Sequence, residues 1–315
     1  MRKAPRQTAR QWIVTHEWMV NPMQQTEWIE KQGLLIWLAE VFSSLGTGLY
    51  LVSIFYNNWW GALLGWLVIM LLKLPLHLIY LGKPTRFWRA LPPFTKAWRT
   101  SWIARGFFFT TLYSILGFLQ LISSFYADGS PVDIALKILA GFFCVLTAIY
   151  CGFMMSYCKS VPFWNTGLLP IVIMIAGIAD GFALLIGVDM WTAGGVNSAT
   201  YEAITRILLL VNILLIGTLV MNSSYRSETA GLSAREMLAG RAAVPFWVGV
   251  VVLGIIAPLA ISILTLGEHG IATHALMIVA IITHTIGAFS LKYCILKVGI
   301  YEPILPKAKV PRRMS

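Results

Sequence analysis

Ionisable side chains stand inside otherwise apolar stretches of this sequence, where each one is costly to bury and therefore often serves a function. Glu40 lies seven residues into the first stretch, and Lys73 and His77 lie one helical turn apart near the end of the second. At about 1.5 Å of rise per residue, Glu40 and Lys73 are predicted roughly 10–12 Å below the same surface. They could form a buried ion pair beside a histidine that titrates near neutral pH. This arrangement could move protons, although a satisfied interfacial histidine and a purely structural ion pair remain alternatives.

A second group of polar residues is predicted nearer the opposite surface. Asp180 lies late in the fifth apolar stretch and Arg206 early in the sixth, so we expect an ion pair between these antiparallel neighbours. His284 is predicted near the middle of the membrane. Together with Glu40 and Lys73, these residues could relay protons. Polar packing among helices is the alternative explanation.

The histidines and cysteines do not fit a haem or metal site. A haem held by two histidines needs them on facing helices at matching depth, and His77, His274 and His284 are predicted at three different depths. The four cysteines contain no CxxC pair, which favours packing roles over metal binding. We therefore predict no haem, no metal and no long-range electron carrier in this chain. It could still present a redox-active lipid, such as quinone, to a partner.

Eight apolar stretches position these residues, and each is long enough to cross roughly 30 Å of hydrocarbon. Hydrophobic residues make up 58% of the chain and charged residues only 12%. The sequence predicts an all-α integral membrane protein with eight transmembrane helices in two four-helix bundles, residues 33–157 and 158–293. An interfacial segment (1–32) and a basic tail (294–315) flank the bundles. The predicted spans are 33–56, 59–81, 102–126, 133–157, 164–187, 200–221, 242–265 and 270–293.

The basic residues alternate between the two sides of these spans. Of the 24 Lys and Arg, 19 fall in the two tails and in the second, fourth and sixth connections. Short cytoplasmic loops collect such residues, so both termini are predicted on the cytoplasmic side. No apolar run in residues 1–32 could serve as a signal peptide. The net charge of +11 therefore indicates contact with anionic lipid or an acidic partner rather than nucleic acid.

The longest basic connection, residues 82–101, mixes five basic residues with four aromatic ones. An amphipathic loop lying on the membrane would have this composition. A docking surface for a peripheral protein is the other interpretation, because aromatic and arginine anchors are enriched at interfaces.

The stretch from Leu74 to Gly106 resembles the NrfD/polysulfide-reductase family of membrane subunits. In that family a histidine near the end of the second span precedes a Leu-Gly-Arg/Lys-Pro element, and a Thr/Ser-Ser-Trp element with a glycine opens the third span. The corresponding residues here are His77, Leu81-Gly82-Lys83-Pro84, Thr100-Ser101-Trp102 and Gly106. The small residues of the first span and the count of eight spans are also similar.

The resemblance implies a haem-free anchor in a prokaryotic cytoplasmic membrane. Such a subunit would bind quinone or menaquinone and dock a ferredoxin-like iron–sulfur subunit, which connects it to a molybdenum or tungsten catalytic subunit. His77 is then the first candidate to hydrogen-bond a quinone oxygen, with Tyr150 second and Arg105 third. Glu40, Lys73, Asp180, Arg206 and His284 would form the proton path. No residue here is predicted to act on the partner enzyme's main substrate.

The charge pattern places the predicted docking face inside the cell. This favours a cytoplasmic substrate, for example an acyl-CoA, over polysulfide or tetrathionate reduced outside. Two competing classes remain: a secondary transporter with no redox partner, and a passive anchor whose polar residues serve packing. Eight spans with charged residues near mid-membrane are compatible with transport, but the sequence shows no clear inverted repeat.

Overall fold

The predicted spans are helical in the computed structural model, which describes residues 19–266 and 271–305. Eight helical segments of the described residues are long and apolar enough to cross a membrane, which together with the family assignment below makes this a multi-pass membrane protein. Residues 1–18 of the predicted interfacial segment and residues 306–315 of the predicted basic tail lie outside the described residues. The spans are α2 (Gly33–Phe55), Trp59–Tyr80, α6 (Trp102–Ala127), α7 (Pro131–Ser156), α8 (Leu168–Thr192), α9 (Ser198–Arg226), Pro245–Leu264 and α12 (Ile271–Lys297).

The second span changes helix type beside its ionisable residues. It consists of α3 (Trp59–Val68), a π-helical segment η1 (Ile69–Lys73) and α4 (Leu74–Tyr80). Pro75 lacks the N–H that would continue the α-helical hydrogen bonds, which accounts for a local departure from α geometry at this level. Lys73 therefore ends a locally widened turn of the kind often found at functional sites, and His77 follows it in α4.

The seventh span is also mixed, with a π-helical segment η3 (Pro245–Ile256) followed by α11 (Ala257–Leu264). Gly254 of η3 packs against Gly287 of α12. A methyl group added to either glycine would collide with the backbone of the other. The two helices can approach this closely because neither has a side chain at the crossing.

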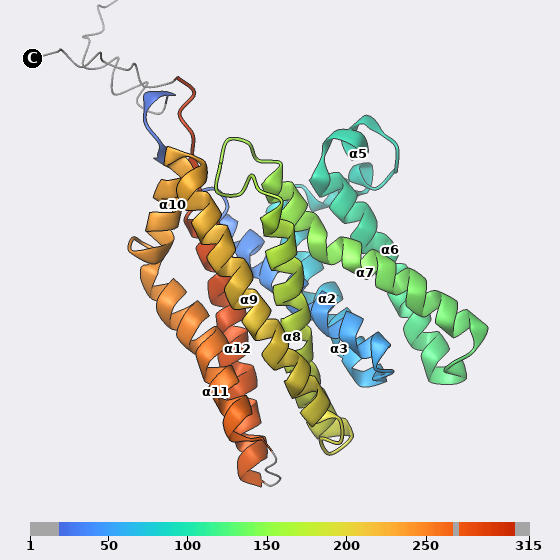
Figure 1. Cartoon of the computed structure of the whole chain (residues 1–315). Coiled ribbons are helices and arrows are strands. Elements are labelled where there is room, and N and C mark those ends of the chain that lie inside the picture. The colour runs from blue at the N-terminus through green and yellow to red at the C-terminus, as the bar shows by residue number, and fades with distance from the viewer. Residues whose placement is uncertain (1–18, 267–270, 306–315) are drawn as a thin grey trace, which may run out of the picture.

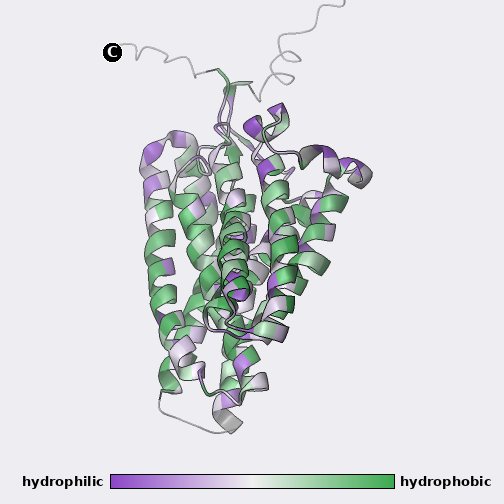
Figure 2. Ribbon diagram, turned by 90° about the vertical axis from the view of Figure 1, so that its right-hand side faces the viewer, coloured by the Kyte–Doolittle hydropathy of each residue, from purple (hydrophilic) through white to green (hydrophobic). Residues whose placement is uncertain are grey.

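Helices α2 and α8 are the most buried of the spans (Figure 1), with 72% and 67% of their apolar windows covered by protein. They meet at Gly48, Gly177 and Gly181, where the backbones touch. Ser44 of α2 reaches across this contact to Asp180 of α8, 2.7 Å away. The remaining spans leave many large apolar side chains exposed, and Figure 2 shows hydrophobic residues along the spans with hydrophilic ones concentrated toward the two ends.

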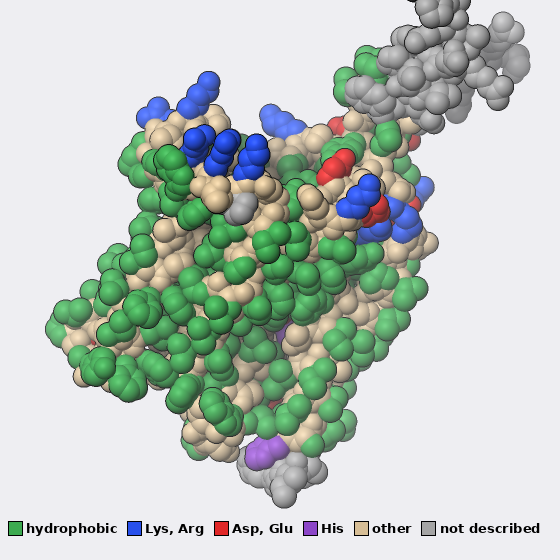
Figure 3. All heavy atoms as spheres, turned by 180° about the vertical axis from the view of Figure 1, so that it is seen from behind, with side chains coloured by type: hydrophobic (Ala, Val, Ile, Leu, Met, Phe, Trp, Pro, Cys, Tyr) green, Lys and Arg blue, Asp and Glu red, His purple; other side chains and the backbone are tan. Residues whose placement is uncertain are grey.

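Short elements gather at one end of the molecule, which we call the basic end. They are β1 (Met23–Gln24), η2 (Pro84–Ala90), α5 (Lys96–Thr100), α10 (Glu228–Leu238) and β2 (Ile300–Tyr301). The two strands pair antiparallel, so segments near the two chain ends lie side by side. Figure 3 shows Lys and Arg side chains gathered at this end and hydrophobic side chains covering the flanks below it.

The helices extend beyond the predicted boundaries at the opposite end. α8 continues to Thr192, five residues past the predicted end at Gly187, and it stops only before Gly194 and Gly195, whose positive φ angles break the helix. α9 begins at Ser198, two residues earlier than predicted. Polar residues such as Asp189 and Glu202 at these ends hid the continuation from a hydropathy-based assignment.

Candidate functional site

His77 lies buried among aromatic side chains at the basic end of the second span. Its side chain is 7% exposed, and its Nδ1 has no hydrogen-bond partner among the described residues. The ring centroids of Phe107 and Tyr150 lie 5.6 Å and 6.4 Å away. Gly106 makes this arrangement possible, because a methyl group at that position would collide with the Tyr150 ring. The structure thus brings His77 and Tyr150 together, as a shared ligand site requires.

Lys73 completes this cluster one helical turn away. Its buried Nζ donates a 2.9 Å hydrogen bond to Thr110 Oγ1 and lies 5.0 Å from the centroid of the Tyr150 ring. The predicted contact ion pair with Glu40 is absent from the ion pairs found among the described residues; the two groups interact only through space.

Glu40 lies at the junction of the two halves of the chain. It is 4% exposed, and its Oε1 has no hydrogen-bond partner among the residues described. Cys151 contacts its carboxyl group, and the charges of Lys73 and Lys292 interact with it electrostatically. Lys292, which is 4% exposed, was not among the predicted site residues, because it lies near the end of a predicted span, where lysines commonly mark the membrane boundary.

Arg105 does not join His77. Its guanidinium donates to the backbone carbonyls of Trp98 and Arg99, at 2.9 and 2.7 Å. The same group lies 4.6 Å from the centroid of the Trp102 ring. These contacts fasten α5 and the basic connection to the start of α6, so the side chain holds the loop rather than a ligand beside His77.

The predicted pair between Asp180 and Arg206 does not form, which corrects the sequence analysis. Asp180 Oδ1 lies 3.0 Å from His284 Nε2, and Arg206 pairs instead with Glu202, at 3.8 Å. Arg206 also donates to Ser262 Oγ at 2.8 Å. Because α8 extends to Thr192, Asp180 lies twelve residues from its end whereas Arg206 lies eight residues into α9. That difference of about one turn places them at different depths.

Glu202 was not among the predicted site residues either. Its spacing of four residues from Arg206 on one helix could have predicted this ion pair.

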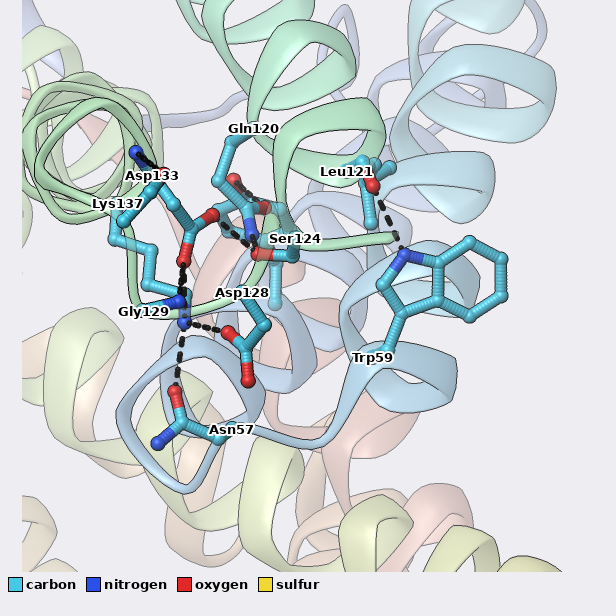
Figure 4. Close-up of polar contacts among 11 residues, drawn as sticks. Asn57, Trp59, Gln120, Leu121, Ser124, Asp128, Gly129, Asp133 and Lys137 are labelled. Carbon is cyan, nitrogen blue, oxygen red and sulfur yellow. Dashed lines mark hydrogen bonds and ion pairs between the residues drawn. The ribbon is translucent and has the colours of Figure 1, made fainter. Parts of the chain in front are cut away.

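A further polar cluster, which the sequence analysis did not find, closes the end of the molecule opposite the basic end (Figure 4). Buried Tyr50 donates to Gln120 at 2.8 Å, and Gln120 donates to Ser124 at 2.7 Å. Ser124 in turn donates to the fully buried Asp133, whose carboxylate pairs with Lys137 at 2.9 Å. Lys137 also contacts Asp128, which follows α6, and Asn57, which lies in the connection after α2, so the cluster ties α6 and α7 to that connection. Each charge is paired, so we interpret the cluster as structural.

No group of three or more His, Cys, Asp or Glu side chains that could hold a metal ion occurs within residues 19–266 and 271–305.

A sequence model of the family described as "Polysulphide reductase, NrfD" matches residues 58–303, which include His77, the basic connection and seven of the eight spans. The chain belongs to the NrfD family. The resemblance inferred from the Leu74–Gly106 stretch is thereby confirmed.

Three relatives share comparable identity with this NrfD-family chain. The C subunit of polysulfide reductase from Wolinella succinogenes is 27% identical over 191 residues, 58% of each protein. The NrfD homolog of Haemophilus influenzae is 29% identical over 54% of this chain and 53% of its own length, and NrfD of Escherichia coli is 28% identical over 58% of each. The chain therefore aligns with less than two thirds of each relative's length. None of these relatives is named as a transporter.

Proposed function

We propose that this NrfD-family chain is a haem-free membrane subunit that binds quinone or quinol beside His77 and exchanges electrons with a docked iron–sulfur subunit. The observation that carries this proposal is the unpartnered Nδ1 of His77, which is buried between the rings of Phe107 and Tyr150. A buried ring nitrogen without a hydrogen bond is costly, and a quinone oxygen would satisfy it. Phe107 and Tyr150 offer flat apolar surfaces for the quinone ring.

The cluster also contains the acid–base groups that this chemistry needs. Reducing a quinone to a quinol takes up two protons with two electrons, and oxidation releases them. His77 can donate or accept one proton at the ligand oxygen. Lys73, held by Thr110 and the Tyr150 ring, places a positive charge beside the oxygen on which negative charge develops. Glu40 would connect the cluster to the second half of the chain.

The partner would dock on the basic end. The connection 82–101 at this end mixes aromatic and basic side chains. Trp88 and Phe94 in it are 57% and 71% exposed. Exposed aromatics and cations on one surface suit an acidic protein partner. The Wolinella relative is named as one lettered component of a reductase, which supports assembly with other subunits. Here these would be a ferredoxin-like iron–sulfur subunit and a molybdenum or tungsten catalytic subunit, acting on a cytoplasmic substrate such as an acyl-CoA.

A gentle-detergent purification tests this assembly. The tagged chain is isolated from its native membrane, and iron, molybdenum, tungsten and quinone are measured in the eluate. We expect a ferredoxin-like polypeptide, the metals and bound quinone. A lone polypeptide without metal or quinone would contradict the proposal and favour transport.

Reversing charge on the docking loop should weaken that assembly. The triple variant Arg86→Glu, Arg89→Glu, Arg99→Glu is expected to reduce co-purified iron on the order of tenfold, because it replaces attraction to an acidic partner with repulsion. The matched control, Lys159→Glu with Arg235→Glu, alters charge in other connections on the basic side. Equal loss of iron in both variants would show that the loop has no special role.

Membrane orientation is a separate prediction. We place the basic end and both termini in the cytoplasm, since the connections at that end carry the Lys and Arg. In a variant lacking the native cysteines, Lys96→Cys should react with a membrane-impermeant thiol reagent only in inverted vesicles. Val196→Cys, which is 80% exposed in the wild type at the opposite end, should react only in intact cells. The reverse pattern would place the docking face outside.

A further inference from the structure

Two cavities lie among the helices of the second half of the chain, away from His77. The first is bounded by α8, α9, η3 and α12, and the second by α8, α9, α11 and α12. Each has a volume of about 30 Å³, which is enough for a water molecule. His284 and Leu209 line both cavities, so the two cavities are neighbours. The second cavity lies nearer the opposite end and contains Glu202 and Arg206.

Unpartnered polar groups line the first cavity. Lys292 Nζ and Asn212 Oδ1 are buried, and neither has a hydrogen-bond partner among the residues that the structure describes. Lys292 also interacts electrostatically with Asp180 and Glu40. A donor and an acceptor facing the same small space would be satisfied by water.

The contacts of His284 fix where its protons lie. Nδ1 is 3.1 Å from the carbonyl oxygen of Gly254, which can only accept, so Nδ1 carries a hydrogen. Nε2 is 3.0 Å from Asp180 Oδ1. A hydrogen bond across that contact therefore needs one more proton, on either the imidazole or the carboxyl group. The other carboxyl oxygen accepts from Ser44 at 2.7 Å. Asp180 and His284 thus lie close enough to share one proton, although no hydrogen bond joins Nε2 to a partner among the described residues.

We propose that Asp180 and His284 form a proton-storing pair that exchanges its shared proton with the opposite end through the cavity lined by Glu202 and Arg206. Release converts the protonated pair into a carboxylate, a neutral imidazole and one proton. The positive charge of Lys292 compensates the carboxylate that remains. Release also leaves two acceptor atoms facing each other, a repulsion that a water entering from either cavity relieves.

Groups from every surrounding helix bear on this exchange. α2 contributes Ser44 and Glu40, α9 contributes Asn212, Glu202 and Arg206, α11 contributes Ser262, and α12 contributes Lys292. Ser262 Oγ lies 3.1 Å from Glu202 Oε2, which fixes this carboxyl group at the cavity wall. The site requires no quinone, so it can be tested independently of the role proposed for His77.

Nuclear magnetic resonance of the chain labelled with ¹⁵N-histidine tests the pair directly. The sequence has five histidines, and the signal lost in His284→Gln identifies the one of interest. We expect the ¹⁵N signal of Nδ1 to be that of a protonated nitrogen. In Asp180→Asn we expect the ¹⁵N signal of Nε2 to change to that of a nitrogen without the shared proton. Thr283→Val is the matched control, because its exposed hydroxyl bonds only to its own helix. An unprotonated Nδ1, or a signal unchanged by Asp180→Asn, would overturn the pair.

The route to the opposite end is tested by hydrogen–deuterium exchange at the His284 ring. Glu202→Gln should slow this exchange on the order of 100-fold, because a positioned acid–base group is removed. Glu202→Asp should retain most of the rate and thereby exclude a folding defect. Glu236→Gln, a carboxyl change on α10 at the basic end, should have no effect. Exchange as fast in Glu202→Gln as in the wild type would rule out this route.

Discussion

Replacing His77 with alanine is expected to lower quinone-coupled turnover on the order of 100-fold or more, the usual contribution of a positioned acid–base group. The partner enzyme should continue to reduce or oxidise an artificial dye at the wild-type rate, because its own cofactors do not depend on this residue. The measurement is quinone-dependent and dye-dependent turnover of the purified complex, with the iron content as a check on assembly. This separation of the two activities would place His77 at the quinone step.

A second histidine supplies the control for this experiment. His274 is exposed and lies at the opposite end of the molecule, so His274→Ala should leave both activities unchanged. His77→Gln, which retains a hydrogen-bonding group of similar length, should recover part of the binding and little of the proton transfer. Quinone turnover unchanged in His77→Ala would refute the assignment, whereas loss of both activities would assign His77 to assembly.

The spans and the residues around His77 could be predicted because both depend on patterns within single stretches of sequence. Twenty or more apolar residues identify a span wherever it packs. Lys73 and His77 share a helix face by their spacing, and Tyr150 ends a later span on the same side. The grouping into two bundles and the position of the termini relative to the cytoplasm stay predictions.

The polar contacts between distant helices could not be predicted in the same way. Asp180 contacts His284 across 104 positions of sequence, and that choice of partner depends on helix rotation and on exact helix ends. The π-helical segment before Pro75 also shifts the side chains that follow it. Arg105 was a candidate because it begins the third span just below the interface, but its guanidinium donates to backbone carbonyls of the loop. The depth of a residue, estimated from its position along an idealised helix, therefore indicated whether it is buried. It did not indicate which side chains on different helices are in contact.

Replacing Gly48 with leucine is expected to have the largest effect on stability. Helices α2 and α8 meet at this point with backbone against backbone, and a methyl group on Gly48 would already collide with the carbonyl group of Gly177. Overpacking in a core costs about 1–3 kcal/mol, and more where backbone must move. We therefore expect a steep fall in the yield of folded protein and in its melting temperature, measured by fluorescence-detected size exclusion after heating.

Gly217→Leu makes this prediction specific, since that glycine lies within α9 and an added Cβ would have nothing within 4 Å. The control adds the same side chain to a span where space is open, so its melting temperature should stay close to the wild-type value. Equal destabilisation by the two changes would mean that leucine at a helical glycine is harmful in general. If Gly48→Leu alone fails, the α2–α8 contact is essential, and with it the alignment of Glu40 and Ser44 on one helix with Asp180 on the other. The cluster around His77 and the Asp180–His284 contact would then share one rigid support, the line along which α2 and α8 touch.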